Sequence, residues 1–290
     1  MTVKKTDNYN FDQLTKRSPE LARHVKPNRY GNLSIDFADP AAVKALHLAL
    51  LLAECVLEWW DIPEGFLCPP VPGRAQYIEE IARLLAADKC GTSPRGEGVR
   101  ILDIGTGANL IYPIIGHARY GWSFVGSELD AEAVKSAKLI IEKNASLRSS
   151  VEIRRQYDPS SIYKGIILPG ERFDAALCNP PFHASAAEAR EGTQRKWKNL
   201  GHDKQEKNLN FGGTGNELWC KGGEAAFAKR MIDESVSFAA QCRWFTILIA
   251  KDDHLRIARR ALTAHSPSDV RTLDMELGNK KSRVLAWSFR

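Results

Sequence analysis

The stretch Val99-Arg-Ile-Leu-Asp-Ile-Gly-Thr-Gly-Ala-Asn-Leu110 decides the fold of this chain of 290 residues. A short apolar run ends near Asp103, and glycines follow at positions 105 and 107. Because glycine lacks a side chain, Gly105 and Gly107 let the backbone approach a ligand closely, while Asp103 can order the loop or attract a cation. Leu110 occupies the third glycine position of a dinucleotide-binding fingerprint, which counts against NAD. The stretch predicts a strand and a glycine-rich turn, which is either a ligand loop or an ordinary connection.

Apolar runs and helical patterns alternate after this stretch. The runs predict strands at 99–104, 122–127, 151–155, 173–178, 244–250, 270–276 and 284–289. Between them, helical spacing predicts helices at 131–144, 224–240 and 253–264. Such alternation is typical of an α/β protein with a mostly parallel sheet and helices on both faces. A ligand is therefore expected at the carboxyl ends of the strands.

The first third of the chain lacks this alternation of strands and helices. Residues 1–36 show no firm period and predict an irregular, basic arm. In residues 37–98, Asp39 is a predicted N-cap, Pro40 suits the first helical position, and helices are expected at 41–60 and 75–87. Three prolines within 66–74 predict a loop. We therefore divide the chain into the arm, this helical segment and a domain at 99–290.

The composition excludes several classes of protein. Hydrophobic residues make up 43% and charged residues 26%, as in ordinary globular proteins. No apolar run reaches the roughly 18 residues of a membrane span, and the N-terminus lacks the apolar core of a signal peptide. The six cysteines form no Cys-x-x-Cys pair, and the seven histidines show no metal spacing. We expect a cytoplasmic protein without a membrane segment or a metal.

Positive charge is concentrated in two places. The net charge is +6, and residues 1–30 carry seven basic side chains against three acidic ones. Residues 190–210 carry six against three. Two basic clusters favour a polyanionic partner, with nucleic acid the first candidate, although a solubilising surface would look the same.

Polar residues follow two predicted strands at the edge where ligands bind. Glu128 can accept both hydroxyls of a ribose, or it can be a carboxylate near a helix cap. Asn179-Pro180-Pro181-Phe182 follows the fourth predicted strand. The Asn179 side chain and the Pro180 carbonyl can accept both protons of a planar amine, and Phe182 offers a face on which a base can stack. An ordinary Asn-Pro turn is the alternative.

Taken together, these motifs resemble a known family. Asp-x-Gly-x-Gly, the acidic residue after the second strand and Asn-Pro-Pro-Phe are similar to those of class I S-adenosylmethionine-dependent methyltransferases that modify amines. Phe-Ala-Asp-Pro at 37–40, Pro-Pro-Val-Pro-Gly-Arg at 69–74, Asp-Ile-Gly-Thr-Gly-Ala at 103–108 and Cys-Asn-Pro-Pro-Phe at 178–182 narrow the resemblance. Over roughly residues 30–290, the chain resembles the bacterial 23S ribosomal RNA adenine-N6 methyltransferases, which are related to a human enzyme that methylates an adenosine in a spliceosomal RNA.

The resemblance implies a Rossmann-like class I methyltransferase fold and a role for each motif. Arg74 would reach the carboxylate of the cofactor, Glu128 would hold its ribose, and Gln156 would lie near its adenine. The residues implied for S-adenosylmethionine are Arg74, Asp103, Gly105, Gly107, Asn109, Glu128 and Gln156. Asn179, Pro180 and Phe182 would hold a flipped-out adenine for direct methyl transfer without a metal.

The resemblance also implies that residues 1–36 form an RNA-binding arm, that the helical segment at 37–98 contributes to the cofactor and RNA sites, and that residues 99–290 form the class I methyltransferase domain. The basic clusters would then bind RNA. The candidate phosphate contacts are Lys4, Lys5, Lys16, Arg17, Arg29, Lys196 and Lys198. The partner would be 23S ribosomal RNA or a ribosome assembly intermediate, and nothing in the sequence demands a dimer, so we expect a monomer. Methylation of another RNA or of a protein glutamine, and a catalytically silent assembly factor, stay open as alternatives. Trp219 fits a core position and a base-facing position equally well.

Overall fold

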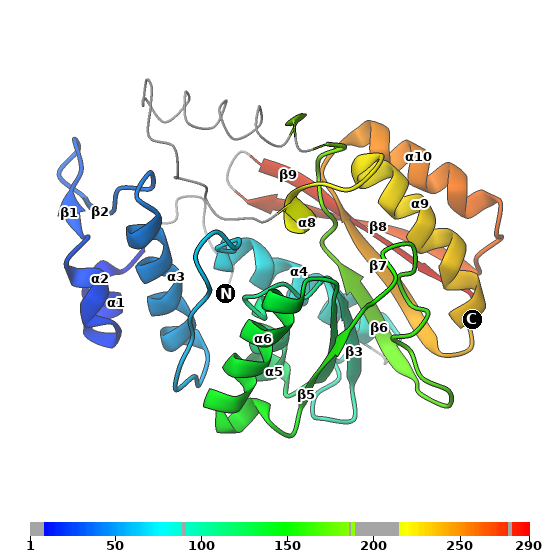
Figure 1. Cartoon of the computed structure of the whole chain (residues 1–290), viewed down its shortest axis with the longest axis horizontal. Helices are drawn as coiled ribbons and strands as arrows, with labels where there is room; N and C mark the ends of the chain where they lie inside the picture. The colour runs from blue at the N-terminus through cyan, green and yellow to red at the C-terminus, as the bar shows by residue number, and fades with distance from the viewer. Residues whose placement is uncertain (1–8, 89–90, 186, 189–214, 278–279) are drawn as a thin grey trace.

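Seven strands form one sheet in the structure, a computed structural model that describes residues 9–88, 91–185, 187–188, 215–277 and 280–290 (Figure 1). The strand order is β5-β4-β3-β6-β7-β9-β8, with β3 to β7 parallel and β9 antiparallel to both β7 and β8. The bounds are β3 (Arg100–Ile104), β4 (Ser123–Glu128), β5 (Val151–Arg155), β6 (Phe173–Cys178), β7 (Cys242–Ile249), β8 (Asp269–Leu277) and β9 (Lys280–Ser288). The predicted α/β fold with a mostly parallel seven-stranded sheet is confirmed.

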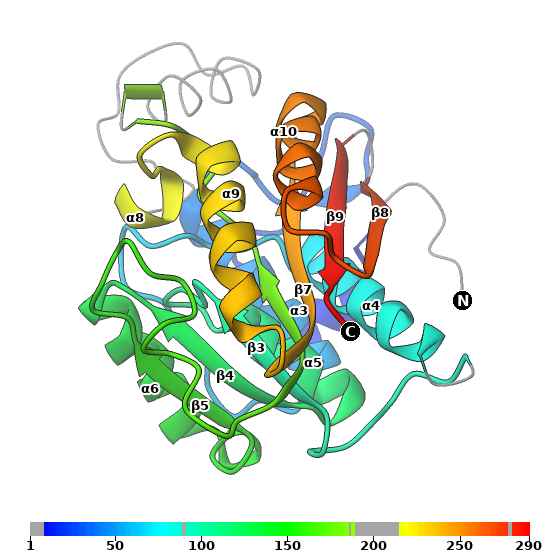
Figure 2. The same cartoon turned by 90° about the vertical axis from the view of Figure 1, so that its right-hand side faces the viewer.

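Helices cover both faces of this sheet. Successive side chains of a strand point to opposite faces, so Ile101 packs into one core and Leu102 into another. The first core includes residues of α3 (Pro40–Glu54), α4 (Val71–Ala87), α5 (Ile111–Tyr120) and α6 (Ala131–Lys143). The second includes residues of α9 (Gly223–Ser235) and α10 (Asp252–Thr263), which lie together on the other side (Figures 1 and 2).

The N-terminal segment is more ordered than we predicted. It forms α1 (Phe11–Arg17), α2 (Pro19–Ala22) and a small antiparallel hairpin of β1 (Lys26–Pro27) and β2 (Leu33–Ser34). Phe11, Leu14 and Leu21 are buried in the same core as α3. The expectation of an irregular arm was therefore wrong for residues 11–22, because two helices this short give too few turns for a detectable period.

The predicted end of the first long helix needs correction. Asp39 caps α3 as predicted, its carboxylate accepting the Ala41 N–H at 2.9 Å. The helix ends at Glu54 and not at position 60, because the buried Asn144 side chain binds the backbone N–H groups of residues 58 and 59 instead.

The proline-rich loop is also shorter than we predicted. Helix α4 begins at Val71, within the segment predicted as loop. Pro72 lies in its first turn, where the absent N–H would have no helical partner anyway. Helix α5, which follows the glycine-rich turn, was not among the predicted helices. No helix among the described residues is long and apolar enough to cross a membrane.

Candidate active site

A cavity of about 330 Å³ opens at the carboxyl ends of β3, β4 and β6. Six of the predicted cofactor residues line it: Arg74, Gly105, Gly107, Asn109, Glu128 and Gln156. Asn179 lines it as well, together with its neighbour Pro181. Pro180 is buried, and neither it nor the half-buried Phe182 lines the cavity. The fold thus brings the glycine-rich loop and the Asn-Pro-Pro segment to one space, although they are about seventy residues apart.

The glycine-rich loop is held against the end of β4. The Gly105 and Thr106 N–H groups both donate to the Ser127 carbonyl at 2.9 Å. Gly105 has a φ of 72°, a conformation that favours glycine, and no atom lies within 4 Å of the place where a Cβ would project. The loop therefore leaves room for a ligand directly in front of its backbone.

Glu128 is the buried acceptor of this loop. One carboxylate oxygen accepts the Gly107 N–H at 3.0 Å. The other accepts the N–H groups of Leu129 and Asp130 at 2.7 and 3.0 Å. Burial raises the pKa of the Glu128 carboxyl, and these three backbone hydrogen bonds oppose the rise. The side chain joins the end of β4 to the glycine-rich turn and presents a carboxylate edge to the cavity.

Asp103, the seventh residue predicted to bind the cofactor, lies near the end of β3, is fully buried and does not itself line the cavity. Neither of its carboxylate oxygens has a hydrogen-bond partner among the described residues. Burial raises the pKa of the Asp103 carboxyl to about 7; the nearby Thr106 hydroxyl and the charge of Arg74 oppose the rise, and the charge of Glu128 adds to it. An unpartnered buried carboxylate is costly, and a cationic ligand group would remove part of that cost.

Arg74 and Tyr112 form the wall that α4 and α5 contribute. The Arg74 guanidinium donates to the Tyr112 hydroxyl at 2.9 Å, and both residues are buried. Tyr77, one turn beyond Arg74 on α4, bonds the Thr246 hydroxyl at 2.9 Å and contacts the backbone of Cys178. This buried tyrosine fixes the end of β6 directly before Asn179.

The sequence did not single out Tyr77 or Tyr112. Tyr77 falls among apolar residues of a predicted helix, as a core residue would, and Tyr112 lies on α5, which was not predicted. Spacing is the signal that finds Tyr77, because residues three apart share a helix face and Tyr77 therefore faces the same way as Arg74.

Asn109 fastens the loop to the proline-rich segment. Its amide nitrogen donates to the Leu67 carbonyl at 3.3 Å, and its amide oxygen accepts the Ile111 N–H at 3.1 Å. Glu217, from the four-residue helix α8 (Gly215–Leu218), accepts the Leu67 N–H at 3.1 Å and also lines the cavity. Sequence reasoning missed Glu217, which only the folded chain brings to this wall.

Asn179 differs from Asn109 in its amide oxygen. Its amide oxygen is buried and has no hydrogen-bond partner among the described residues. Because a buried acceptor without a partner is uncommon and costly, this oxygen indicates a donor that is supplied by a ligand.

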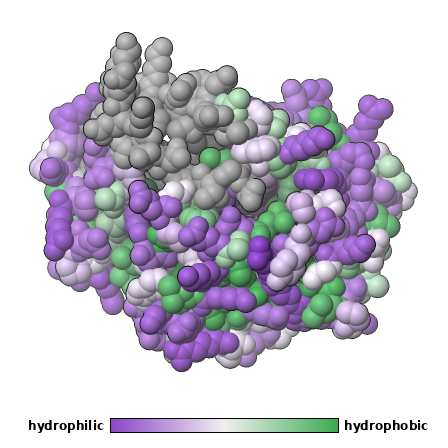
Figure 3. Space-filling model, viewed as in Figure 1, coloured by the Kyte–Doolittle hydropathy of each residue, from purple (hydrophilic) through white to green (hydrophobic). Residues whose placement is uncertain are grey.

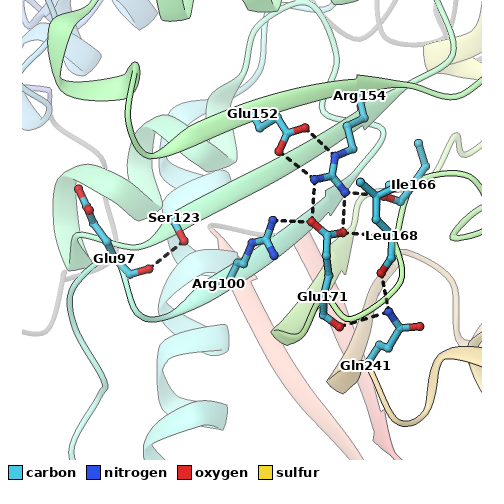
Figure 4. Close-up of polar contacts among 9 residues, drawn as sticks. All are labelled: Glu97, Arg100, Ser123, Glu152, Arg154, Ile166, Leu168, Glu171 and Gln241. Atoms are coloured by element: carbon cyan, nitrogen blue, oxygen red, sulfur yellow. Dashed lines mark hydrogen bonds and ion pairs between the residues drawn. The ribbon is translucent and has the colours of Figure 1, made fainter.

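The loop between β5 and β6 closes the far side of the cavity. Gln156 bridges it, donating to the Lys164 carbonyl and accepting the Asp158 N–H. The Glu234 carboxylate of α9 accepts three consecutive backbone N–H groups of the loop, at residues 162, 163 and 164. At its other end, Glu171 lies between the guanidinium groups of Arg100 and Arg154, at 2.6 to 2.7 Å (Figure 4).

Replacing Glu171 with glutamine is expected to lower the free energy of unfolding by about 2 kcal/mol near neutral pH. Hydrogen bonds from Arg154 hold the pKa of the Glu171 carboxyl at about 2, against about 4.3 in the unfolded chain. Its folded pKa is depressed, so the stabilisation is complete above about pH 4.3 and is lost as the pH falls toward 2.

Urea unfolding at several pH values tests this expectation. The difference between wild type and the Glu171→Gln variant should stay constant from pH 7 to 5 and shrink below that. Glu142→Gln, an exposed carboxylate on α6, is the matched control and should change stability by less than about 0.5 kcal/mol. A difference that does not vary with pH would contradict the assigned role of the carboxylate charge.

The predicted RNA contacts are placed only in part. Lys16, Arg17 and Arg29 are exposed on α1 and on the N-terminal hairpin. Lys4, Lys5, Lys196 and Lys198 lie outside the described residues. Trp219 lines the cavity with about a third of its surface exposed. Within the described ranges, no group of three or more His, Cys, Asp or Glu side chains is placed to hold a metal ion.

Comparison with known proteins gives a consistent result. The family Methyltransf_10, described as RNA methyltransferase, matches residues 2–290. A ribosomal RNA large subunit methyltransferase F of Cytophaga hutchinsonii is 53% identical over 99% of this chain and 89% of its own length. A ribosomal RNA large subunit methyltransferase F of Pectobacterium atrosepticum is 52% identical over 98% of this chain and 90% of its own length.

Solved structures of a human protein share the fold. The human METTL16 catalytic domain in complex with a MAT2A 3'UTR hairpin has a TM-score of 0.82 and 30% identity, covering 100% of this chain and 96% of that one. The N-terminal domain of human METTL16 in complex with SAH has a TM-score of 0.77 and 26% identity, covering 100% of this chain and 99% of that one.

Proposed function

We propose, from the fact that this chain belongs to the Methyltransf_10 family of RNA methyltransferases, that it methylates the exocyclic N6 amine of one adenosine in 23S ribosomal RNA. The chain is an S-adenosylmethionine-dependent ribosomal RNA methyltransferase of the large subunit methyltransferase F type. The choice of adenine N6 is the finer part of the proposal. One observation carries it: the buried, unpartnered amide oxygen of Asn179 lies at the same cavity as the loop at 105–107.

The proposed chemistry depends on holding the amine. The lone pair of an adenine amine is delocalised into the ring, which makes the nitrogen a poor nucleophile. In our proposal the Asn179 amide oxygen and the Pro180 carbonyl accept its two protons and favour a more tetrahedral nitrogen. Phe182 stacks on the unstacked base and offsets part of the cost of flipping it out of the RNA. These residues act by position and electrostatics, without a covalent enzyme intermediate and without a metal.

The other half of the cavity fits the cofactor. S-adenosylmethionine, when bound, supplies an electrophilic methyl group on a sulfonium. Arg74 offers a buried cation for the carboxylate, and the Glu128 edge offers acceptors for the ribose hydroxyls. Asp103, with both oxygens unpartnered, suits a cationic group. Gln156, on the wall formed by the β5–β6 loop, is the candidate neighbour of the adenine ring.

Cofactor affinity is expected to depend on pH through Asp103. Its raised pKa of about 7 means that the carboxyl is neutral below that pH and charged above it. A cationic ligand favours the charged form, so affinity should fall as the pH drops from 7.5 to 5.5, by at most about tenfold per pH unit. Calorimetric titration in buffers of different ionisation enthalpy should show proton release on binding at pH 6. The Asp103→Asn variant should bind more weakly at pH 7.5 and lose this dependence; an unchanged profile would refute the assignment.

The RNA side of the proposal rests on charge. We propose that the N-terminal segment, with Lys16, Arg17 and Arg29 exposed, and the basic residues at 190–210 contact phosphates of ribosomal RNA or of an assembly intermediate in the cytoplasm. Such contacts make affinity fall steeply with salt. Deleting the segment is a poor test of this role, because Phe11, Leu14 and Leu21 belong to the hydrophobic core.

The decisive test is methyl transfer from labelled S-adenosylmethionine to protein-free ribosomal RNA from cells that lack this gene. Nucleoside analysis should find N6-methyladenosine at one site. Cofactor binding without transfer to this RNA would point to a ribonucleoprotein, another RNA or a protein glutamine, which should then be offered in turn. Absence of cofactor binding would support a catalytically silent assembly factor instead.

A further inference from the structure

The hairpin of β1 and β2 presents a fixed tip to solvent. The Asn28 side-chain oxygen accepts the N–H groups of Tyr30 and Asn32 at 2.9 and 3.1 Å. The Asn28 N–H donates to the Asn32 carbonyl at 2.8 Å, and Gly31 takes a φ of 80° to close the turn. These bonds set the backbone of the tip, from which the Arg29 and Tyr30 side chains project.

Tyr30, at this tip, is a large aromatic side chain that lies exposed to solvent. Its side chain is 71% exposed, and the Arg29 guanidinium lies over the ring at 4.7 Å from the centroid. A ring with a cation beside it is suited to stack on a nucleic acid base while the cation meets a phosphate. Nothing in the fold or in the candidate active site uses this pair.

A second cavity lies at the base of the same hairpin. It measures about 340 Å³ and is lined by Arg23, Lys26 and His24, with Asp36 and Asp39 among its other residues. Both carboxylates already have partners. Each accepts a backbone N–H, and an Asp39 carboxylate oxygen lies 3.4 Å from the Nδ1 atom of His24. Arg23 and Lys26 have no ion pair among the described residues. Two cations without an ion pair in the described part of the chain, at the base of a hairpin that carries an exposed aromatic ring, favour an RNA backbone over an apolar protein partner.

The hairpin projects on the same side of the molecule as the carboxyl ends of the parallel strands (Figures 1 and 2). The part of the surface around it is mostly hydrophilic (Figure 3). We propose that residues 23–34 form a second RNA-binding site, in which Tyr30 stacks on an unpaired base of the substrate RNA and Arg23, Lys26 and Arg29 contact its phosphates. This inference rests on the proposed function and adds to it a recognition element for unpaired RNA away from the target adenosine.

Methyl-transfer kinetics on unmodified 23S ribosomal RNA test the site. We expect Tyr30→Ala to raise the KM for RNA about tenfold, as loss of one base stack does, with kcat and cofactor affinity unchanged. Tyr30→Phe should stay within about twofold of wild type because it keeps the ring. Arg95→Ala is the control: this exposed arginine also lies over a tyrosine ring, that of Tyr120, next to the amino end of β4 on the opposite edge of the sheet, and its KM should change little.

Salt dependence separates the stacking of Tyr30 from the phosphate contacts of Arg23 and Lys26. A plot of log Kd for the RNA against log salt should be parallel for Tyr30→Ala and wild type. The double variant Arg23→Gln/Lys26→Gln should have a slope lower by about 0.7 for each phosphate that the protein no longer neutralises. An unchanged KM and Kd in Tyr30→Ala, with active wild type, would overturn this inference alone. A wild type that binds cofactor but transfers no methyl to any RNA would instead overturn the proposed function.

Discussion

Replacing Asn179 with alanine is expected to lower the rate of methyl transfer by about 10³-fold or more while leaving cofactor affinity within about threefold of wild type. The rate loss is of the size seen when one preorganised group is removed from a reacting centre. The cofactor half of the cavity is built from β3, β4 and α4, none of which depends on the Asn179 side chain. Single-turnover methyl transfer to RNA, with calorimetric titration of S-adenosylmethionine, measures both quantities.

The stability of this variant provides the control. Because the Asn179 amide oxygen bonds no described residue, removing it should leave the thermal midpoint nearly unchanged. Asn144→Ala is the contrasting variant: this fully buried asparagine bonds backbone atoms of residues 58, 59 and 140, so its loss should destabilise the fold. An Asn179→Ala protein that still methylates at a tenth of the wild-type rate would refute the proposed role of the side chain.

The sheet was predictable from sequence because each strand carries its own signal. Strands β5 and β6 were predicted to the residue: apolar and charged residues alternate at the start of β5, β6 is mostly apolar, and turn-forming residues flank both strands. The motif at 179–182 could be placed at the active edge for the same reason: it follows directly after β6. The order of the strands then brings residues from β3, β4 and β6 together.

The residues that sequence reasoning missed depend on contacts over long separations. Glu217 bonds a backbone N–H 150 residues away, and Tyr77 contacts Cys178 and Thr246 across the core. Helical spacing places Tyr77 on the same helix face as Arg74, but no local pattern encodes its distant partners or those of Glu217. The early end of α3 has the same origin, because the competing acceptor is Asn144, about ninety residues further along the chain. Local pattern thus sets the elements, while tertiary contacts set their ends and complete the site.

Replacing Glu128 with glutamine is expected to weaken S-adenosylmethionine binding by about 10²-fold. The two carboxylate oxygens together accept three backbone N–H groups. A glutamine must turn its NH₂ toward one side, either toward Gly107 or toward the pair at 129 and 130, and so leaves at least one buried donor facing another donor. Such an unsatisfied group costs about 1–3 kcal/mol. In the proposed complex the ribose hydroxyls also lose a charged acceptor, and hydrogen bonds to charged groups contribute about 1.5–3 kcal/mol.

The neighbouring Asp130 supplies the matched control for this experiment. Its carboxylate caps α6 by accepting the N–H groups of Glu132 and Ala133, and it does not line the cavity. Asparagine caps helices as well as aspartate does, so Asp130→Asn should change neither stability nor cofactor affinity appreciably, although it removes the same charge two residues away. Equal weakening in both variants would show that the general negative charge at the end of β4 governs cofactor binding. Weakening in Glu128→Gln alone would tie the effect to one buried carboxylate. That is the expected result, because the three backbone hydrogen bonds hold this carboxylate in one orientation.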